Sequence, residues 1–282
     1  MSNTPIKSWI ETVKPVATWI VIVAILVQCA WSSFAHFVLF PTGILQSLYY
    51  YTGSILHPTF TGYVLLSICM GYLLCYIGGL RAKDFAIFHK QILPAVGFTL
   101  LAWAIIQLSP LLSGDALVVD PTWSEQGELM HRFSRFFIGQ LFGNALYEEL
   151  FYRALLISQF TILFRKKCST TKALIFAVIC SQLLFALIHI PHRIVNGIPF
   201  DQMVVPMANL FIAGLKFTAL FLLSKNIFIP VGVHALGNRS PNIFEQCDDQ
   251  FGLTSIILIF LAILFWKRIC RKIPKHPNVG KL

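Results

Sequence analysis

The chain has 282 residues, of which 56% are hydrophobic and only 12% are charged. A soluble domain carries about 25% charged residues, so this composition excludes an ordinary soluble protein and predicts an all-α polytopic membrane protein. The net charge of +10 does not indicate nucleic-acid binding, because the Lys and Arg residues flank apolar segments and no basic–aromatic binding module is present.

Apolar stretches long enough to approach the thickness of a bilayer recur along the chain. About eight transmembrane helices are predicted, at 16–40, 61–79, 92–112, 134–164, 173–190, 204–223, 227–239 and 252–266. The first stretch resembles a signal peptide, but it is longer than the apolar core of a signal peptide and has no convincing cleavage site. We therefore interpret it as a retained span.

Two of the predicted spans have unusual lengths. The fourth stretch is long, and we expect it to begin as an interfacial helix near 129–137. The seventh stretch is short. The longest polar connection, 113–132, is acidic, and we interpret it as a solvated loop, with a lid over a site as the alternative.

The distribution of Lys and Arg predicts the orientation in the membrane. If successive spans cross the membrane in opposite directions, four arginines lie on one side of it: Arg132, Arg135, Arg193 and Arg239. The opposite side receives a large excess of Lys and Arg from both terminal segments and three connections. Both termini are therefore expected to be cytoplasmic, although one miscounted span would reverse this.

No internal repeat or flexible linker divides the chain, so we expect one membrane domain with three sections. These are N-terminal helices with an outer loop (1–133), a core (134–240), and a last helix with a basic cytoplasmic tail (241–282). The cysteines have no C-x-x-C or zinc-ribbon spacing and are interpreted as small buried hydrophobic residues. They are Cys29, Cys69, Cys75, Cys168, Cys180, Cys247 and Cys270.

Three charged residues lie inside the apolar fourth stretch, in the segment NALYEELFYRALL. Charges within a span are expensive, at roughly 2.5–3.5 kcal/mol for a centrally placed residue, and usually face a cavity or a partner. Glu149 and Arg153 are four residues apart on one helical face and are expected to form an ion pair. Glu148 points about 100° away from that face, which leaves its carboxylate free for general base or acid chemistry.

Two further polar motifs end later spans. His189 closes Phe185-Ala-Leu-Ile-His189, and alone it would be interpreted as an interfacial histidine bonded to a backbone carbonyl. His234 and Asn238, four residues apart, would alone be interpreted as contacts between helices. Together with Glu148 they are expected to meet in one intramembrane polar site, where a base and hydrogen-bond donors suit a hydrolase.

The order, spacing and apolar setting of these motifs resemble those of the CPBP (CAAX protease/bacteriocin-processing, Abi) family of intramembrane proteases. The motifs are E-E-x-x-x-R (Glu148, Glu149, Arg153), F-x-x-x-H (Phe185, His189) and H-x-x-x-N (His234, Asn238). The resemblance implies an intramembrane endopeptidase in which Glu148 and His189 activate water. It further implies that His234 and Asn238 stabilise the oxyanion and that Glu149 and Arg153 support the site.

The resemblance leaves the metal and the substrate open. A metal-free mechanism is favoured, with zinc held by Glu148, His189 and His234 as the alternative. The expected partners are the lipid bilayer and a peptide or protein substrate, either a prenylated CAAX protein or an exported peptide such as a bacteriocin. CAAX processing would require a site open to the cytosol, whereas the charge distribution opens it toward the opposite face.

Other functions are less consistent with the sequence. H-E-x-x-H and G-x-S-x-G are absent, which argues against zincin-like and rhomboid-type proteases. A transporter with Glu148 as proton carrier would favour inverted repeats, which are not visible. The remaining alternative is a non-catalytic immunity or scaffold protein that binds a peptide.

Overall fold

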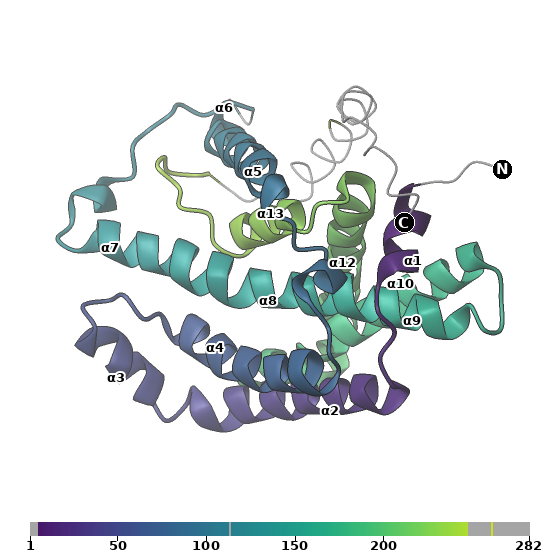
Figure 1. Ribbon diagram of the computed structural model, residues 1–282. Coiled ribbons are helices and arrows are strands. Elements are labelled where there is room, and N and C mark those ends of the chain that lie inside the picture. Colours follow the sequence, from purple (N-terminus) through teal and green to yellow (C-terminus); the bar gives the residue numbers. More distant parts are fainter. Residues whose placement is uncertain (1–4, 113, 248–260, 262–282) are drawn as a thin grey trace.

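The computed structural model describes residues 5–112, 114–247 and 261, and Figure 1 shows its helices. The first half contains α1 (Pro5–Thr12), α2 (Thr18–Phe34), η1 (Ala35–Leu39), α3 (Ile44–Tyr51), α4 (Pro58–Gly71), η2 (Tyr72–Ile77), η3 (Ala82–Phe85), η4 (His89–Gln91), α5 (Ile92–Gln107), α6 (Ser109–Leu112) and η5 (Pro121–Ser124). The second half contains α7 (Glu128–Phe133), η6 (Ser134–Ala145), α8 (Leu146–Glu148), η7 (Glu149–Leu156), α9 (Ile157–Phe164), α10 (Thr170–Leu187), α11 (Ile190–Val195), η8 (Phe200–Gln202), α12 (Val204–Ser224) and α13 (Phe228–Asn238).

The prediction of an all-helical membrane fold is confirmed at this level. Within the described residues there is no β-strand, and a single isolated bridge joins Val119 to Phe244. Five helical segments are long and apolar enough to cross a membrane: Thr18–Leu39, Pro58–Ile77, Ala82–Gln107, Thr170–Val195 and Phe200–Ser224. Large apolar side chains such as Trp19, Leu26 and Leu93 are exposed on them, as expected for surfaces that contact lipid.

The predicted count of eight spans is not confirmed. The fourth predicted span is helical throughout 134–164 but contains four charged residues and is not among the five apolar segments. The seventh corresponds to α13, whose 11 residues extend about 16 Å at 1.5 Å per residue, about half of the hydrocarbon thickness. The eighth lies almost entirely outside the described residues.

The prediction that the cysteines are buried is wrong for half of those described. Cys29, Cys69 and Cys75 are exposed, Cys168 and Cys180 are partly exposed, and Cys247 is buried. The apolar helices are only partly covered by protein, so a small apolar side chain on them also occurs on the outer surface. Cys270 lies outside the described residues.

One long helical run, from α7 through η6, α8 and η7 to α9, crosses the whole molecule (Figure 1). α4 packs against η6, and α10 packs against both α9 and α12. The apolar core lies along this run, where Tyr152, Leu155 and Phe185 are almost completely buried. The helix that carries the charged triplet is therefore enclosed by its neighbours rather than exposed to lipid.

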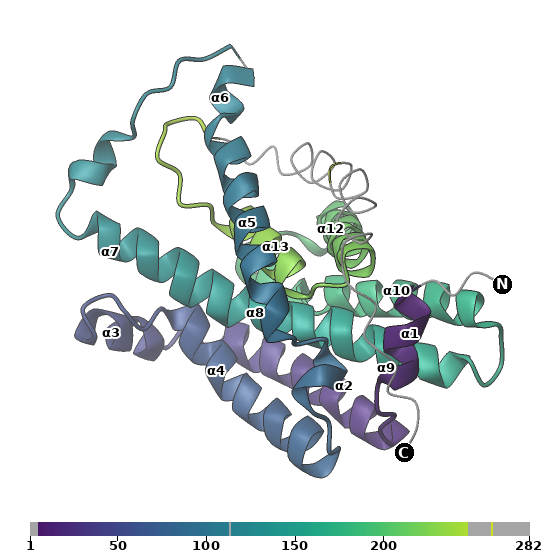
Figure 2. The ribbon, with the colours of Figure 1, turned by 45° about the horizontal axis from the view of Figure 1, so that its top comes forward.

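The short helix α13 is held from two sides. It packs against α5 and η6, and Figure 2 shows it crossing next to α5. The Oδ1 atom of Asn226 accepts a hydrogen bond from the backbone N–H of Phe228 at 3.0 Å, and its Nδ2 donates to the backbone oxygen of Gln91 at 2.8 Å. These bonds fix the start of α13 and therefore the position of His234 on its second turn.

Candidate active site

Glu149 and Arg153 form the predicted ion pair. Arg153 Nη1 lies 3.2 Å from Glu149 Oε1, and neither side chain is exposed to any extent. The Arg153 guanidinium also lies over the rings of Phe185, at 4.3 Å, and Phe217, at 5.3 Å. A charge buried among apolar helices is strongly destabilising unless it is paired, so this pair holds η7 against α10 and α12.

Glu149 has a second partner that the sequence did not indicate. His234 Nδ1 lies 2.8 Å from Glu149 Oε1, so one carboxylate oxygen binds both Arg153 and His234. With Nδ1 hydrogen-bonded to a carboxylate, the other ring nitrogen, Nε2, faces the cavity. Such a second-shell carboxylate fixes both the tautomer and the orientation of the ring.

Glu148 is not bound by Arg153, as predicted, and its carboxylate faces both histidines. Oε1 lies 4.0 Å from His189 Nε2, and Oε2 lies 3.7 Å from His234 Nε2. Both gaps exceed a direct hydrogen bond and are of the size that a water molecule bridges. Oε2 is buried without a hydrogen-bond partner among the described residues, and such an atom requires a polar ligand or water.

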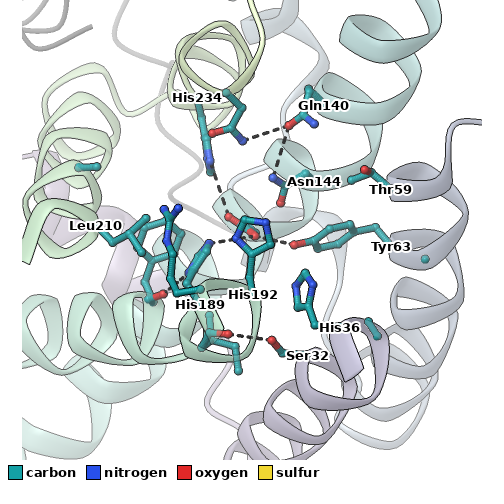
Figure 3. Close-up of a pocket in the computed structure, with 18 of the residues that line it drawn as sticks. Ser32, His36, Thr59, Tyr63, Gln140, Asn144, His189, His192, Leu210 and His234 are labelled. Carbon is teal, nitrogen blue, oxygen red and sulfur yellow. Dashed lines mark hydrogen bonds and ion pairs between the residues drawn. The ribbon is translucent and has the colours of Figure 1, made fainter. Parts of the chain in front are cut away.

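Tyr63 is a site residue that the sequence analysis missed. Its hydroxyl donates a hydrogen bond of 2.6 Å to Glu148 Oε1 from α4, outside the predicted core. Figure 3 shows Tyr63, His189 and His234 directed toward one another. A tyrosine in an apolar span gives no sequence signal of its own, because tyrosines are common at membrane interfaces.

His189 is oriented by its own helix. Its Nδ1 lies 2.7 Å from the backbone oxygen of Phe185, and a carbonyl can only accept, so Nδ1 carries the proton of that bond. The backbone bond that we expected for an isolated histidine is therefore present. It directs the other nitrogen, Nε2, toward Glu148.

Asn238 is bonded to Gln140, which in turn accepts from Asn144, and the sequence analysis missed both amides. Its Nδ2 donates to Gln140 Oε1 at 3.1 Å, and Asn144 Nδ2 donates to the same oxygen at 3.5 Å. Gln140 and Asn144 precede Glu148 by eight and four residues on the same helical run. Polar residues four positions apart lie on one helical face, so this pattern in an apolar segment would have indicated that Gln140 and Asn144 face the same site as Glu148.

These groups line one cavity of about 830 Å³. Of the six predicted site residues, Glu148, His189, His234 and Asn238 line it, whereas Glu149 and Arg153 are buried behind its wall. Tyr63, Gln140 and Asn144 also line it (Figure 3). The cavity therefore combines a carboxylate, two imidazoles and a set of amide donors in an otherwise apolar environment.

The charges of the buried groups nearly balance. Two carboxylates and one guanidinium leave one formal negative charge among the buried groups. In a medium of low dielectric constant an uncompensated charge is poorly solvated, which favours a proton or a polar ligand beside it. A group that exchanges one proton over a few ångströms can act as both base and acid.

The donor types at the site suit zinc, but their placement does not. The described part of the chain contains no group of three or more His, Cys, Asp or Glu side chains positioned to hold a metal ion. The mechanism below therefore uses the groups of the chain and water.

Comparison with known proteins agrees with the motifs. Residues 131–239 match the family model described as Type II CAAX prenyl endopeptidase Rce1-like. The chain has no significant match among curated proteins or among solved structures. The matched segment contains all three motifs. In this multi-pass membrane protein, residues 131–239 are therefore similar to the Rce1-like, type II CAAX prenyl endopeptidase family, to which the CPBP motifs also point.

Proposed function

We propose that the protein is an intramembrane endopeptidase in which Glu148 and His189 activate a water molecule for attack on a peptide bond. The observation that carries this proposal is the buried Glu148 carboxylate, whose unpartnered Oε2 lies 3.7 Å from His234 Nε2 and whose Oε1 lies 4.0 Å from His189 Nε2, gaps that a water molecule can bridge. The family match supports the reaction class, since the family is named for peptidase activity.

The first step is nucleophilic attack. The water donates one proton to Glu148 as its oxygen attacks the carbonyl carbon of the scissile bond, and His189 Nε2, whose lone pair is free, accepts the second hydrogen bond from the water. General base catalysis by a positioned side chain contributes roughly 10²–10⁴-fold to a rate. The product of this step is a tetrahedral intermediate with a negatively charged oxygen.

The oxyanion is stabilised from the opposite wall. Protonated His234 donates from Nε2, because Nδ1 is bound to Glu149, and the Asn238 amide donates its remaining N–H. Preorganised donors of this kind contribute about 10²–10³-fold each. Gln140 and Asn144 act as positioning residues, because they orient the Asn238 amide without contacting the substrate.

The second step breaks the bond. Glu148 returns its proton to the departing nitrogen as the C–N bond cleaves, which releases an amine and a carboxylic acid. One water is consumed, and the proton on the site is restored. Tyr63 holds the Glu148 carboxylate in one orientation through both steps, while Glu149 and Arg153 hold the helix and the His234 ring.

We further propose that the substrate is a peptide carrying an apolar group, either a prenylated C-terminus of the CAAX type or an exported peptide. The cavity wall includes apolar side chains from several helices, among them Trp31, Phe40 and Leu210. Side chains of this kind bind a prenyl chain or an apolar residue next to the scissile bond. Both termini are proposed to be cytoplasmic, as the Lys and Arg distribution predicts, and in this orientation the cavity opens to the face that an exported peptide reaches. A CAAX substrate requires the reverse orientation, with the cavity open to the cytosol.

The test is hydrolysis of a quenched fluorescent peptide, with and without a farnesyl group, by purified protein in lipid nanodiscs. Glu148→Gln and His189→Ala are each expected to lower kcat by at least about 10²-fold. Glu125→Gln is the matched control, because Glu125 is exposed on the outer loop, and it is expected to retain full activity.

Three outcomes would change the proposal. Full activity of both Glu148→Gln and His189→Ala would contradict the proposed chemistry. Peptide binding without hydrolysis by the wild type would instead favour a non-catalytic, peptide-binding protein. Activity that survives dialysis against a chelator supports the metal-free mechanism, whereas loss restored by zinc would contradict it.

A further inference from the structure

The helices α2 and η1 carry a stripe of polar side chains along one wall of the cavity. Gln28, Ser32 and His36 follow one another at intervals of four residues, and all three line the cavity. They belong to Thr18–Leu39, a segment that is apolar and long enough to cross a membrane. A polar side chain in such a segment is unfavourable unless it meets a partner, so each member of the stripe is expected to have one.

Gln28 has a partner at only one end of its amide. Its Oε1 accepts a hydrogen bond of 2.5 Å from the Tyr147 hydroxyl, whereas its Nε2 bonds no group among the described residues. Because Tyr147 holds the oxygen, the orientation of the amide is fixed. Gln28 is 5% exposed, so its two N–H donors are largely removed from bulk water and remain available to a ligand in the cavity.

Two tyrosines connect Gln28 to the catalytic carboxylate. The Tyr147 ring lies 5.4 Å from the Tyr63 ring, measured between centroids, and the Tyr63 hydroxyl donates to Glu148 at 2.6 Å. Gln28 and Glu148 both line the cavity. The unused donors of Gln28 therefore belong to the same space in which, under the proposed mechanism, the scissile bond is attacked.

The polar stripe lies across the cavity from the proposed oxyanion donors. Figure 3 shows Ser32 and His36 on the side opposite His234. A peptide whose scissile carbonyl points toward His234 and Asn238 therefore has its other edge toward α2. In an extended chain successive carbonyls point to opposite edges, so the carbonyl next to the scissile one points toward the α2 wall.

An uncharged donor on this wall matches a main-chain carbonyl. Trp31 and Ala35, which line the cavity from the same helices, are apolar, so this part of the wall offers neutral hydrogen bonds rather than charge. An α-helical peptide keeps its own carbonyls bonded, whereas an extended segment inside a membrane leaves them without partners, which is strongly unfavourable. An amide N–H that bonds one of them therefore favours the extended conformation.

We propose that Gln28 Nε2 donates a hydrogen bond to the main-chain carbonyl oxygen next to the scissile carbonyl of an extended peptide substrate. The inference rests on the proposed function, because it places the peptide that Glu148 and His189 hydrolyse. Gln28 is then a substrate-binding residue, and Tyr147 is a positioning residue that orients its amide. Gln28 precedes residues 131–239, so the N-terminal section of the chain takes part in binding the substrate.

The test compares peptides that differ by one atom. In each, the carbonyl oxygen on one side of the scissile carbonyl is replaced by sulfur, a weaker hydrogen-bond acceptor, and the all-oxygen peptide is the reference. The wild-type protein in nanodiscs is expected to lose roughly 2- to 10-fold in kcat/KM at one of the two positions, the size of one neutral hydrogen bond. Gln28→Leu/Tyr147→Phe, which leaves no buried hydroxyl unpaired, is expected to abolish this sensitivity to sulfur. It is also expected to raise KM for the reference peptide by a similar factor with kcat near the wild-type value, because the bond is present before and during the reaction.

Gln28→Met, which keeps the length of the side chain but has no N–H, is the second variant and is expected to behave in the same way. Gln46→Leu is the control, because Gln46 is exposed on α3 and does not line the cavity, and it is expected to keep the wild-type KM and sulfur sensitivity. No sulfur effect in the wild type, or an equal effect in the Gln28 variants, would overturn this inference alone and leave the endopeptidase intact. A general loss of folding is distinguishable, because it affects all peptides equally. Absence of hydrolysis of every peptide by the wild type would overturn the proposed function and this inference with it.

Discussion

At the scale of single residues, the two adjacent glutamates have different environments. Glu149 is fully buried and bound to Arg153 and His234, whereas Glu148 has one oxygen on Tyr63 and the other without a partner. The sequence predicted this division, because residues four apart on a helix share a face and residues one apart do not. It did not predict His234 as a partner of Glu149, since that contact depends on how α13 packs.

Tyr63 provides the first prediction. Tyr63→Phe removes the hydroxyl that donates to Glu148 and keeps the ring in its packing position. A hydrogen bond to a charged group contributes about 1.5–3 kcal/mol, so kcat is expected to fall by roughly 10- to 100-fold. KM and the melting temperature are expected to stay near the wild-type values, because the ring and its apolar contacts remain.

The matched control is Tyr72→Phe, also on the first half of the chain, where the side chain is exposed and stacks on Tyr76. It is expected to leave kcat unchanged. An equal fall of kcat in both variants, or a Tyr63→Phe effect confined to thermal stability, would show that Tyr63 has only a structural role.

At the scale of helices, the site depends on how closely α13 approaches α5. A Cβ atom added to Gly232 would collide with the Thr99 side chain, so only glycine fits at this contact. His234 lies two residues further along α13. The sequence indicated a short seventh helix but not its partner, because the spacing of apolar residues defines a helix and not the neighbour that it packs against.

Gly232→Ala is therefore expected to displace α13 and reduce catalysis. A displacement of about 1 Å in a catalytic group can lower a rate by about 10²-fold, and a loss of at least tenfold in kcat/KM is expected here. The double variant Gly232→Ala/Thr99→Gly is expected to recover part of the activity, because Thr99→Gly removes the side-chain atoms with which the new Cβ collides. Peptide hydrolysis and thermal unfolding are the measurements.

Gly97→Ala on α5 is the control, since a Cβ atom there meets nothing within 4 Å. It is expected to retain activity and to stabilise the helix slightly. Wild-type activity of Gly232→Ala, or no recovery in the double variant, would contradict the close-approach explanation.

At the scale of the whole molecule, the acidic loop at 114–127 is bonded to the segment after α13. Arg132 pairs with Asp120 at 2.6 Å and donates to the backbone oxygen of Asn242 at 2.6 Å, and Val119 and Phe244 form a bridge. No described residue of 114–127 lines the cavity, so the interpretation as a lid has no support in this arrangement. The sequence predicted a solvated acidic loop, but not its anchor, which joins residues more than a hundred positions apart.

This anchor is expected to depend on pH. Hydrogen bonds from Thr122, followed by those from Arg132, lower the pKa of Asp120 from 3.8 to about 2. Because the pKa is lower in the folded state, the contribution of Asp120 to stability is fully present above about pH 4 and is lost as the pH falls toward 2. The protection factors of the amides at residues 117–124, which are exchange rates corrected for the intrinsic effect of pH, are therefore expected to fall over that range.

Asp120→Asn is expected to remove the pH dependence of these protection factors and to lower them at neutral pH. Asp115→Asn is the control, because Asp115 is exposed and forms no ion pair within the described residues, and its exchange profile is expected to match the wild type. Identical pH profiles for the wild type and Asp120→Asn would show that the ion pair does not anchor the loop.

The central claim is that Glu148 activates water for hydrolysis of a peptide bond in the cavity. The most direct measurement is mass spectrometry of the products after incubation of a farnesylated peptide with the purified protein in water enriched in ¹⁸O. The account predicts that the wild type releases an N-terminal fragment with one ¹⁸O in its new carboxylate, and that Glu148→Gln releases at least about a hundredfold less of it. Product formed at equal rates by the wild type and Glu148→Gln, or released without ¹⁸O, would contradict it.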